Sequence, residues 1–324
     1  MRYTEIRTAA LAAAVLGAGG LAFGQDSQPA KPNEAEPAPA AKITTEESGP
    51  RPQAQFTIRG MHDFSADLKD SAGSVSIDRA GANFSMLFPV GQRSQLNVGL
   101  GSELSFYNFK NATGFASGFT EPWDDTEQLN GTVSFRSQAT RQWSWYAGAG
   151  IDSSLQRGAD FERSITGGLF GGVNYGVSER LNFGVGMLLR SRLEDNGQLI
   201  PIPSVHWQIS DKWSLGTSSG VSGTGAALTY QATEALSFSL EGAYETREYR
   251  LDDSAAAPDG VGRDRRLPIS VSAAWNITRR VAVGGRVGVD AFQEYTLVDS
   301  NSNEVSKVKT DPAIFIGASL VISF

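Results

Sequence analysis

The chain has 324 residues, no cysteine and a formal net charge of −7. Without cysteine it cannot form a disulfide framework, a thiolate zinc site or a cysteine nucleophile. Acidic residues outnumber basic ones and no basic block occurs, which argues against a nucleic-acid-binding protein. The 36 glycines follow no triplet period, so the chain is not collagen-like.

The N-terminus has the three parts of a secretory signal peptide. Two arginines give a basic start, residues 8–23 are small and apolar, and the small residues Ala22 and Gly24 precede the expected cut. The apolar stretch is shorter than the roughly 20 apolar residues of a membrane-spanning helix. We therefore expect residues 1–24 to be a signal peptide and the protein to be exported.

Residues 25–53 change in composition to proline, alanine and acidic residues, with almost no large apolar side chain. Such a segment cannot bury enough apolar surface to offset the entropy of the chain. We expect a disordered Pro/Ala-rich periplasmic tether. Its composition favours a spacer over a segment that binds the cell wall.

After the tether, apolar residues alternate with polar residues or glycine over long stretches. In one run, Leu181, Phe183 and Val185 lie on one face, and Asn182 and Gly184 lie on the other. A period of two indicates β-strands with one apolar face. Many runs exceed ten residues, and a strand that crosses a membrane needs about 9–11, whereas globular strands average about 5–6. A soluble secreted β-sandwich is the weaker alternative.

Short turns alternate with longer polar loops along this part of the chain. The longer loops are expected at residues 109–125, 156–162, 193–198, 252–263 and 298–309. Short periplasmic turns and long outer loops are typical of outer-membrane barrels. We predict an all-β fold, a transmembrane antiparallel up-and-down β-barrel over residues 54–324, located in the outer membrane of a bacterium.

We predict 14 strands for this barrel, with 12 as the alternative. The expected strands are residues 54–64, 74–88, 94–108, 126–138, 143–155, 163–175, 180–192, 199–208, 213–221, 225–232, 236–251, 264–275, 280–295 and 310–324. An even number places both chain ends on the periplasmic side. Residues 199–232 are the least regular, because Pro201, Pro203 and several glycines could remove a hairpin there.

Most of the tryptophans lie within a few residues of an expected short turn: Trp143, Trp145, Trp207, Trp213 and Trp275. Aromatic residues collect at the membrane interfaces of barrels. Bulky aromatics can end strands in any sheet protein, but their gathering at one end favours an interfacial girdle. Trp123 is the exception, because it lies in a long loop.

The C-terminal segment Ile314–Phe324 reads IFIGASLVISF and alternates up to a terminal aromatic residue. It resembles the closing strand of bacterial outer-membrane β-barrel proteins, which implies that the barrel-assembly machinery reads this strand, with Phe324 as the assembly signal. The chain from Ala226 onward, with ALTYQATEALSFSLEGAYETREYRL and PDGVGRDRRLPISVSAAWNITRRVAVGG, is also similar to an uncharacterised family of such barrels. That family has no established activity, so the resemblance implies no functional residue.

The two histidines do not suggest a catalytic site. Outer-membrane phospholipases place a serine and a histidine on the lipid-facing side, but His206 shares its face with Ser204 and Gln208 and should point inward. His62, beside Asp63, has no obvious partner in the sequence. We predict that the protein is not an enzyme and expect no catalytic residue, no cofactor and no metal.

The inward face is expected to carry charges of both signs, from residues Glu103, Arg136, Asp152, Arg190, Arg192, Glu241, Glu245, Arg247, Arg286, Asp290 and Glu294. Such charges can line a wet pore and set its ion selectivity. They can equally form paired ladders that plug the lumen, and both interpretations stay open. The loop 109–125, with Phe115, Phe119 and Trp123, is the candidate for a constriction or for contact with a hydrophobic ligand.

Our leading prediction is a passive, porin-like channel for small hydrophilic solutes. The alternative is a non-transporting structural outer-membrane protein with a plugged lumen, linked to the envelope through residues 25–53. A transporter of hydrophobic compounds is less favoured, because the similar fourteen-stranded fatty-acid transporters have an N-terminal hatch where this chain has the tether. The expected partners are outer-membrane lipid, the assembly machinery and small solutes, and the oligomeric state is left open.

Overall fold

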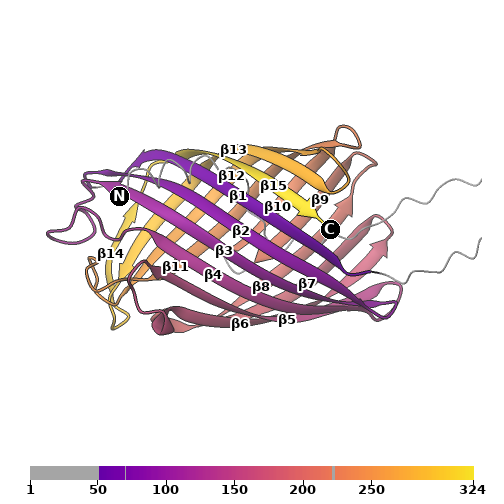
Figure 1. Ribbon diagram of the computed structural model, residues 1–324, viewed down its shortest axis with the longest axis horizontal. Helices are drawn as coiled ribbons and strands as arrows, with labels where there is room; N and C mark the ends of the chain where they lie inside the picture. Colours follow the sequence, from indigo (N-terminus) through magenta and orange to yellow (C-terminus); the bar gives the residue numbers. More distant parts are fainter. Residues whose placement is uncertain (1–50, 70, 221–222) are drawn as a thin grey trace, which may run out of the picture.

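The computed structural model describes residues 51–69, 71–220 and 223–324 (Figure 1). The expected signal peptide, and the expected tether up to residue 50, lie outside these residues. Among the described residues, no helix has the length and apolar character needed to cross a membrane.

The described residues form 15 β-strands and one short 3-10 helix, η1 (Glu162–Ser164). The strands are β1 (Gln53–Asp67), β2 (Ser74–Val90), β3 (Ser94–Lys110), β4 (Thr126–Gln138), β5 (Trp143–Gln156), β6 (Ile165–Ser178), β7 (Leu181–Arg192), β8 (Asp195–Gln208), β9 (Trp213–Gly220), β10 (Gly223–Gln231), β11 (Leu236–Arg250), β12 (Val261–Asn276), β13 (Val281–Val298), β14 (Glu304–Lys309) and β15 (Ala313–Ser323).

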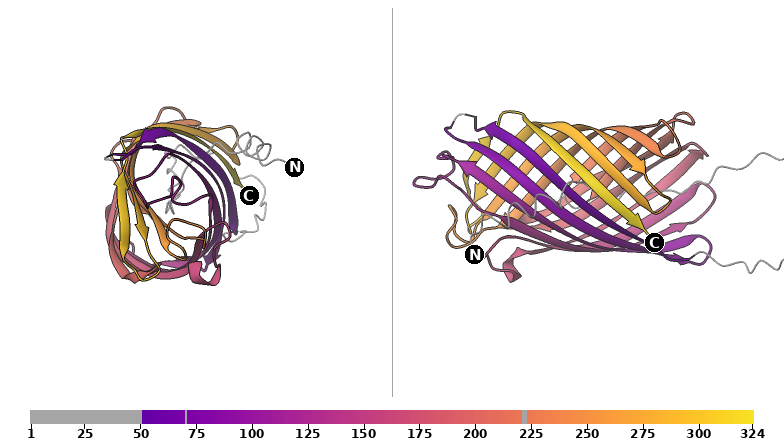
Figure 2. Two further views of the ribbon diagram at one scale, coloured as in Figure 1. Left: turned by 90° about the vertical axis from the view of Figure 1, so that its left-hand side faces the viewer. Right: turned by 45° about the horizontal axis from the view of Figure 1, so that its top comes forward.

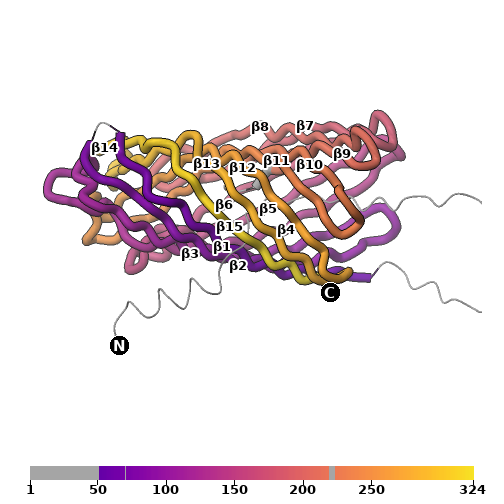
Figure 3. Tube along the Cα trace, turned by 90° about the horizontal axis from the view of Figure 1, so that it is seen from above, coloured from indigo at the N-terminus to yellow at the C-terminus, as the bar shows by residue number. Residues whose placement is uncertain are grey.

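All the strands except β14 close into one antiparallel barrel of 14 strands. Neighbours pair in chain order from β1 to β13, then β13 pairs with β15 and β15 pairs with β1. Figure 2 shows the ring seen along the barrel, and Figure 3 shows the tilt of its strands. The predicted fold is confirmed, and residues 199–232 supply three strands, β8, β9 and β10, so the count is not reduced to 12.

Two predicted loops differ from the structure. β8 begins at Asp195, so the expected loop 193–198 is only a tight turn in which Glu194 adopts a φ of 48°. Within the expected loop 298–309, β14 pairs with the end of β13. With six residues, β14 is shorter than a membrane-crossing strand, so it extends a hairpin beyond the ring without adding a strand to it.

The outward faces of the strands form an apolar belt. Leu100, Leu169 and Val185 are 59%, 62% and 60% exposed, and similar residues recur on most strands. So many large apolar side chains around one ring exceed the scattered exposure that is normal in water. The belt therefore fits a surface that contacts membrane lipid.

The end of the barrel that carries the short turns also carries the start of β1 and the end of β15 (Figure 1). The five tryptophans expected in the girdle are exposed near this end, each by 40–53%: Trp143, Trp145, Trp207, Trp213 and Trp275. Phe324 is 68% exposed, and its N–H donates to the Ala54 carbonyl at 2.8 Å. The roles of these residues at the interface and in assembly stay predictions.

The inner wall is tightly packed where β13 passes β12 and β15. A Cβ added to Gly288 would lie 2.4 Å from the Ile269 carbonyl oxygen and 2.5 Å from the Phe315 ring. Phe315 is fully buried, so the ring has little freedom to move aside. Gly242 on the outward face of β11 provides a contrast, because a Cβ there would meet no atom within 4 Å.

We expect Gly288→Val to destabilise the barrel by about 1–3 kcal/mol, because overpacking forces the wall or the Phe315 ring to shift. Gly242→Val is the matched control and should leave stability nearly unchanged. Urea unfolding of the protein folded in detergent, followed by tryptophan fluorescence, measures both. Equal unfolding midpoints for the two variants would contradict this account of the packing.

Candidate functional site in the barrel lumen

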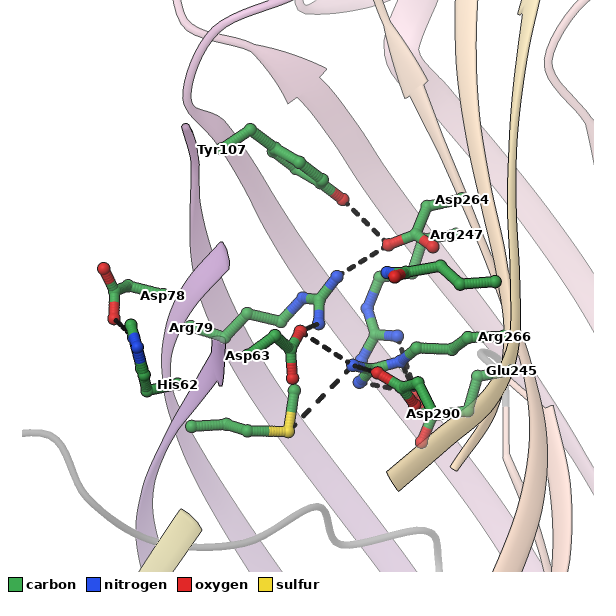
Figure 4. A network of polar contacts seen from close by, with 12 residues as sticks. His62, Asp63, Asp78, Arg79, Tyr107, Glu245, Arg247, Asp264, Arg266 and Asp290 are labelled. Atoms are coloured by element: carbon green, nitrogen blue, oxygen red, sulfur yellow. Dashed lines mark hydrogen bonds and ion pairs between the residues drawn. The ribbon is translucent and has the colours of Figure 1, made fainter. Parts of the chain in front are cut away.

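A layer of ion pairs crosses the lumen in the half nearer to the long loops (Figure 4). Arg79 of β2 donates to Asp63 of β1 at 2.8 Å and, across the lumen, to Asp264 of β12 at 2.6 Å. The phenol of Tyr107 on β3 also donates to Asp264, at 3.0 Å. All four side chains are buried.

A second arginine, Arg266 of β12, extends the layer. Its guanidinium lies 3.2 Å from Asp63, 2.8 Å from Glu245 of β11 and 3.5 Å from Asp290 of β13. The side chain of Arg266 is only 1% exposed. Asp63 is therefore shared by two arginines that come from different parts of the ring.

A third arginine, Arg247 of β11, completes the layer. It donates to Glu245 at 2.7 Å and to Glu103 of β3 at 2.9 Å, and Glu103 also accepts from Arg59 of β1 at 2.9 Å. The ring order runs β11, β12, β13, β15, β1, β2, β3, so β11 and β3 are six places apart in a ring of 14. These contacts therefore span nearly the full width of the lumen.

An apolar cluster lies beyond the ion-pair layer, toward the loops. Phe109 at the end of β3 and Phe115 and Trp123 of the following loop pack around Tyr295 of β13, with ring centroids 5.2–6.4 Å apart. These four side chains are at most 3% exposed. The loop singled out as a possible constriction thus folds into the interior, although Phe119 remains 37% exposed.

Ten of the 11 predicted lumen residues lie on the inner face of the wall. Glu103, Glu245, Arg247 and Asp290 belong to the ion-pair layer, and Arg286 lies beside it. The others are spread over the inner wall of β4, β5, β7 and β11: Arg136, Asp152, Arg190, Arg192 and Glu241. Their influence on ion selectivity stays a prediction.

Glu294 is not on the inner face. A β-bulge beside Arg266 shifts the register of β12 and β13, so the alternation along β13 changes side. Tyr295 takes the interior position, and Glu294 forms ion pairs on the opposite face with Arg265 at 3.3 Å and Lys307 at 3.5 Å. The sequence-based placement of Glu294 in the lumen was therefore wrong.

Arg192 lies at the end of β7, two residues after Arg190, and the exposed Ser191 lies between them. Alternation along the strand therefore places Arg192 on the same face as the inward-facing Arg190. It forms ion pairs with Asp195 and with Glu248 of β11. Arg192 therefore ties the end of β7 to β11, and its influence on ion selectivity stays a prediction.

The sequence analysis missed five residues of the layer: Arg59, Asp63, Arg79, Asp264 and Arg266. The sequence does contain a signal for an inward position of Arg59 and Asp63. These two residues share one face of β1, whereas Ile58 and His62 lie on the other. His62 itself lies on the outer side of β1, where its Nδ1 is 2.7 Å from Asp78. Which charges meet across the lumen depends on ring closure, which no local pattern encodes.

The barrel wall is incompletely paired between β8 and β9, and we call this stretch of the wall the seam. These strands pair at three positions, from His206↔Gly216 to Gln208↔Ser214, whereas β7 and β8 pair at 11 and β9 and β10 at eight. Unpaired strand edges are costly inside a membrane, because lipid cannot satisfy backbone N–H and C=O groups. The seam therefore needs a local explanation.

Two prolines provide that explanation. The N–H of Val205 points toward β9 and donates to the Thr217 hydroxyl at 2.9 Å. Residues at alternate positions of a strand direct their N–H groups to the same side, and Pro201 and Pro203 occupy these positions without an N–H. The Thr217 hydroxyl is also 3.3 Å from the Pro203 carbonyl oxygen. At these three positions the edge of β8 that faces β9 therefore has no unpaired backbone N–H group.

The inner wall beside this seam carries an apolar stripe, formed by Tyr146, Phe170, Leu188, Ile200 and Ile202. Phe170 of β6 pairs with Leu188 of β7, which pairs with Ile200 of β8. The residues adjacent to these three in the sequence point outward and are 52–62% exposed: Leu169, Leu189 and Leu199. A Cβ on Gly216, which pairs with His206 of β8, would meet no atom within 4 Å, so the inner wall faces open space at this position.

Comparison with known proteins gives one family match. The model of a family described as a domain of unknown function, DUF6268, matches residues 127–323. No curated protein matches the sequence.

Among solved structures, an outer membrane channel from Pseudomonas putida F1 is 11% identical, with 88% of this chain and 100% of that chain covered and a TM-score of 0.47. A Pseudomonas aeruginosa FadL homologue is 12% identical, with 84% and 89% covered and a TM-score of 0.47. The toluene transporter TodX of P. putida is 9% identical, with 84% and 90% covered and a TM-score of 0.45.

We expect Arg79→Met to destabilise the barrel by about 3–5 kcal/mol, because it leaves buried carboxylates without their partner. Arg180→Gln is the control, since the Arg180–Asp211 pair is at the surface, with Arg180 61% exposed, and should change stability by at most about 1 kcal/mol. The loss of gel-resolved folded protein with rising urea measures both. Similar midpoints for the two variants would show that the layer does not hold the barrel together.

Proposed function

We propose that this chain, which belongs to the DUF6268 family of domains of unknown function, is an outer-membrane channel for small hydrophobic compounds. One observation carries the proposal: the apolar stripe on the inner wall leads to the seam between β8 and β9. A compound on the stripe has a route between the lumen and the membrane lipid through this seam.

The chemistry of the stripe favours an apolar solute. Burial of apolar surface against its side chains stabilises a bound molecule by about 25 cal/mol per Å², while a hydrated polar solute gains little there. Pro201 and Pro203 on the membrane side of the seam are exposed and offer no N–H group. At these two residues an apolar molecule therefore meets no backbone N–H group, and the side-chain hydrogen bonds of Thr217 are the contacts that hold β8 to β9 there.

The interior of the barrel offers less support for a passive channel for hydrophilic solutes. Such a solute needs a continuous wet path, and the ion-pair layer and the aromatic cluster both cross the lumen. The expectation of a tether in place of an N-terminal hatch also weighs less against a hydrophobic-compound channel than the sequence suggested. In this barrel, Phe115 and Trp123 of the β3–β4 loop fill the interior instead.

The ion-pair layer favours one other function, a structural outer-membrane protein with a plugged lumen. Its arginines tie β1, β2 and β3 to β11 and β12, which strengthens the wall whether or not anything passes. The seam distinguishes the two proposals, because a purely structural barrel has no use for an interrupted wall.

Closing the seam with a disulfide should reduce transport of an apolar compound. Val205→Cys with Thr217→Cys places thiols across the seam, and the natural chain has no cysteine that could interfere. We expect the oxidised variant to admit an apolar fluorescent probe into proteoliposomes at least several-fold more slowly than the reduced variant. Reduction should restore the rate.

The matched control is Val173→Cys with Val185→Cys, because these residues pair directly on the outer side of β6 and β7, away from the seam. Its disulfide should leave the rate unchanged. Equal rates for the oxidised and reduced seam variant, with the disulfide confirmed by mass spectrometry, would refute the proposed route and favour the structural function.

Single-channel conductance tests the hydrophilic alternative directly. We expect folded wild-type protein in a planar lipid bilayer to show no lasting conductance steps, because paired side chains cross the lumen. Heat-modifiable gel migration verifies folding beforehand. Discrete, lasting steps from the wild-type barrel would instead support a porin-like channel.

A further inference from the structure

A small recess lies in the lumen on the side of the ion-pair layer that faces the short turns. Its volume is about 20 Å³, and it opens partly into the lumen. The charged side chains that line it comprise five arginines and one glutamate: Arg59, Arg79, Arg247, Arg266, Arg286 and Glu103. So strong an excess of guanidinium groups around one space favours occupation by an anion.

Arg286 of β13 is the member of this group that forms no ion pair with a carboxylate in the described part of the chain. Its buried Nε has no hydrogen-bond partner among the described residues, and one terminal nitrogen contacts the Met61 sulfur at 3.0 Å. A thioether is a weak acceptor. The guanidinium also lies over the Phe315 ring, 5.2 Å from its centroid. A largely buried guanidinium held only by sulfur and an aromatic face is poorly compensated for its lost hydration.

The nearby carboxylates are already shared by other arginines. Glu103 accepts from Arg59 and Arg247, and Glu245 accepts from Arg247 and Arg266. Neither carboxylate forms an ion pair within 4 Å with Arg286 in the described part of the chain. The charge that Arg286 brings to the recess is therefore balanced only at longer range.

Arg79 adds a second unsatisfied donor beside the same recess. Its two terminal nitrogens bond to Asp63 and Asp264, but its buried Nε has no partner among the described residues. Arg59 and Arg79 come from β1 and β2, and Arg286 comes from β13. A ligand that accepts hydrogen bonds here would join strands on both sides of the closure between β15 and β1.

We infer that this recess is a binding site for a small oxyanion, the phosphate or carboxylate group of a solute in the lumen, with Arg286 as its principal ligand. An oxyanion supplies the several acceptor oxygens that the planar guanidinium fork matches, which a spherical halide does not. Because the recess is open on one side, the anion can seat an oxygen among the arginines while the rest of it remains in the lumen. The site is independent of the proposed route for hydrophobic compounds.

The test uses the folded full chain in detergent, in a buffer without phosphate or carboxylate, titrated calorimetrically with sodium phosphate and separately with sodium acetate. We expect saturable binding of at least one of these anions to the wild-type protein. Arg286→Gln should raise the Kd at least about tenfold, since it removes a charge-assisted hydrogen-bonding pair. Sodium chloride at equal ionic strength should not reproduce the heat of binding.

Arg136→Gln is the matched control, because Arg136 is an inward-facing arginine of β4 that does not line the recess. It should bind the anion with the wild-type Kd. Arg286→Lys keeps the positive charge but loses the planar guanidinium, so its Kd should be several-fold higher than that of the wild type. This variant takes the place of Arg286→Gln if Arg286→Gln does not fold. The absence of saturable binding, or equal Kd values for the wild type and a folded Arg286 variant, would overturn the assignment.

Discussion

The structure depends on one constraint: inside a membrane, every backbone N–H and C=O group of the wall must have a partner within the protein. Pairing of β1 with β15 closes the ring and meets this requirement where an open sheet would leave two free edges. The same constraint explains the chemistry of the seam between β8 and β9. There Pro201 and Pro203 have no N–H group and the Thr217 hydroxyl accepts from the Val205 N–H, so the edge of β8 has no unpaired N–H group at these three positions.

Closure of the ring also creates the interior in which charges must be paired. Arg79, Arg247 and Arg266 each contact at least two carboxylates, and these contacts join strands that are far apart along the chain. Removing a charge from water is costly, so such groups are tolerated when they compensate one another. The layer therefore couples the two sides of the barrel closure, and the aromatic cluster above it shields it from the loop end.

The inner wall consequently has three regions with different chemistry. The ion-pair layer and the aromatic cluster obstruct a direct polar path. The apolar stripe beside the seam offers a surface suited to hydrophobic compounds, while the arginine-lined recess below the layer offers one suited to an oxyanion. The apolar stripe and the recess are the surfaces on which our two proposals rest.

The sequence by itself determined the strands of the ring, the apolar belt and the end at which the tryptophans gather, because a period of two and the spacing of turns are local properties. It left the number of strands at 14 or 12 and did not predict β14, which lies within an expected loop. It also placed ten charged residues, among them Glu103 and Arg247, on the inner face. Only the tertiary structure decided which charges meet, because partners such as Arg79 and Asp264 are 185 residues apart and are joined by ring closure. It also decided the exception, because a bulge turned Glu294 to the other face.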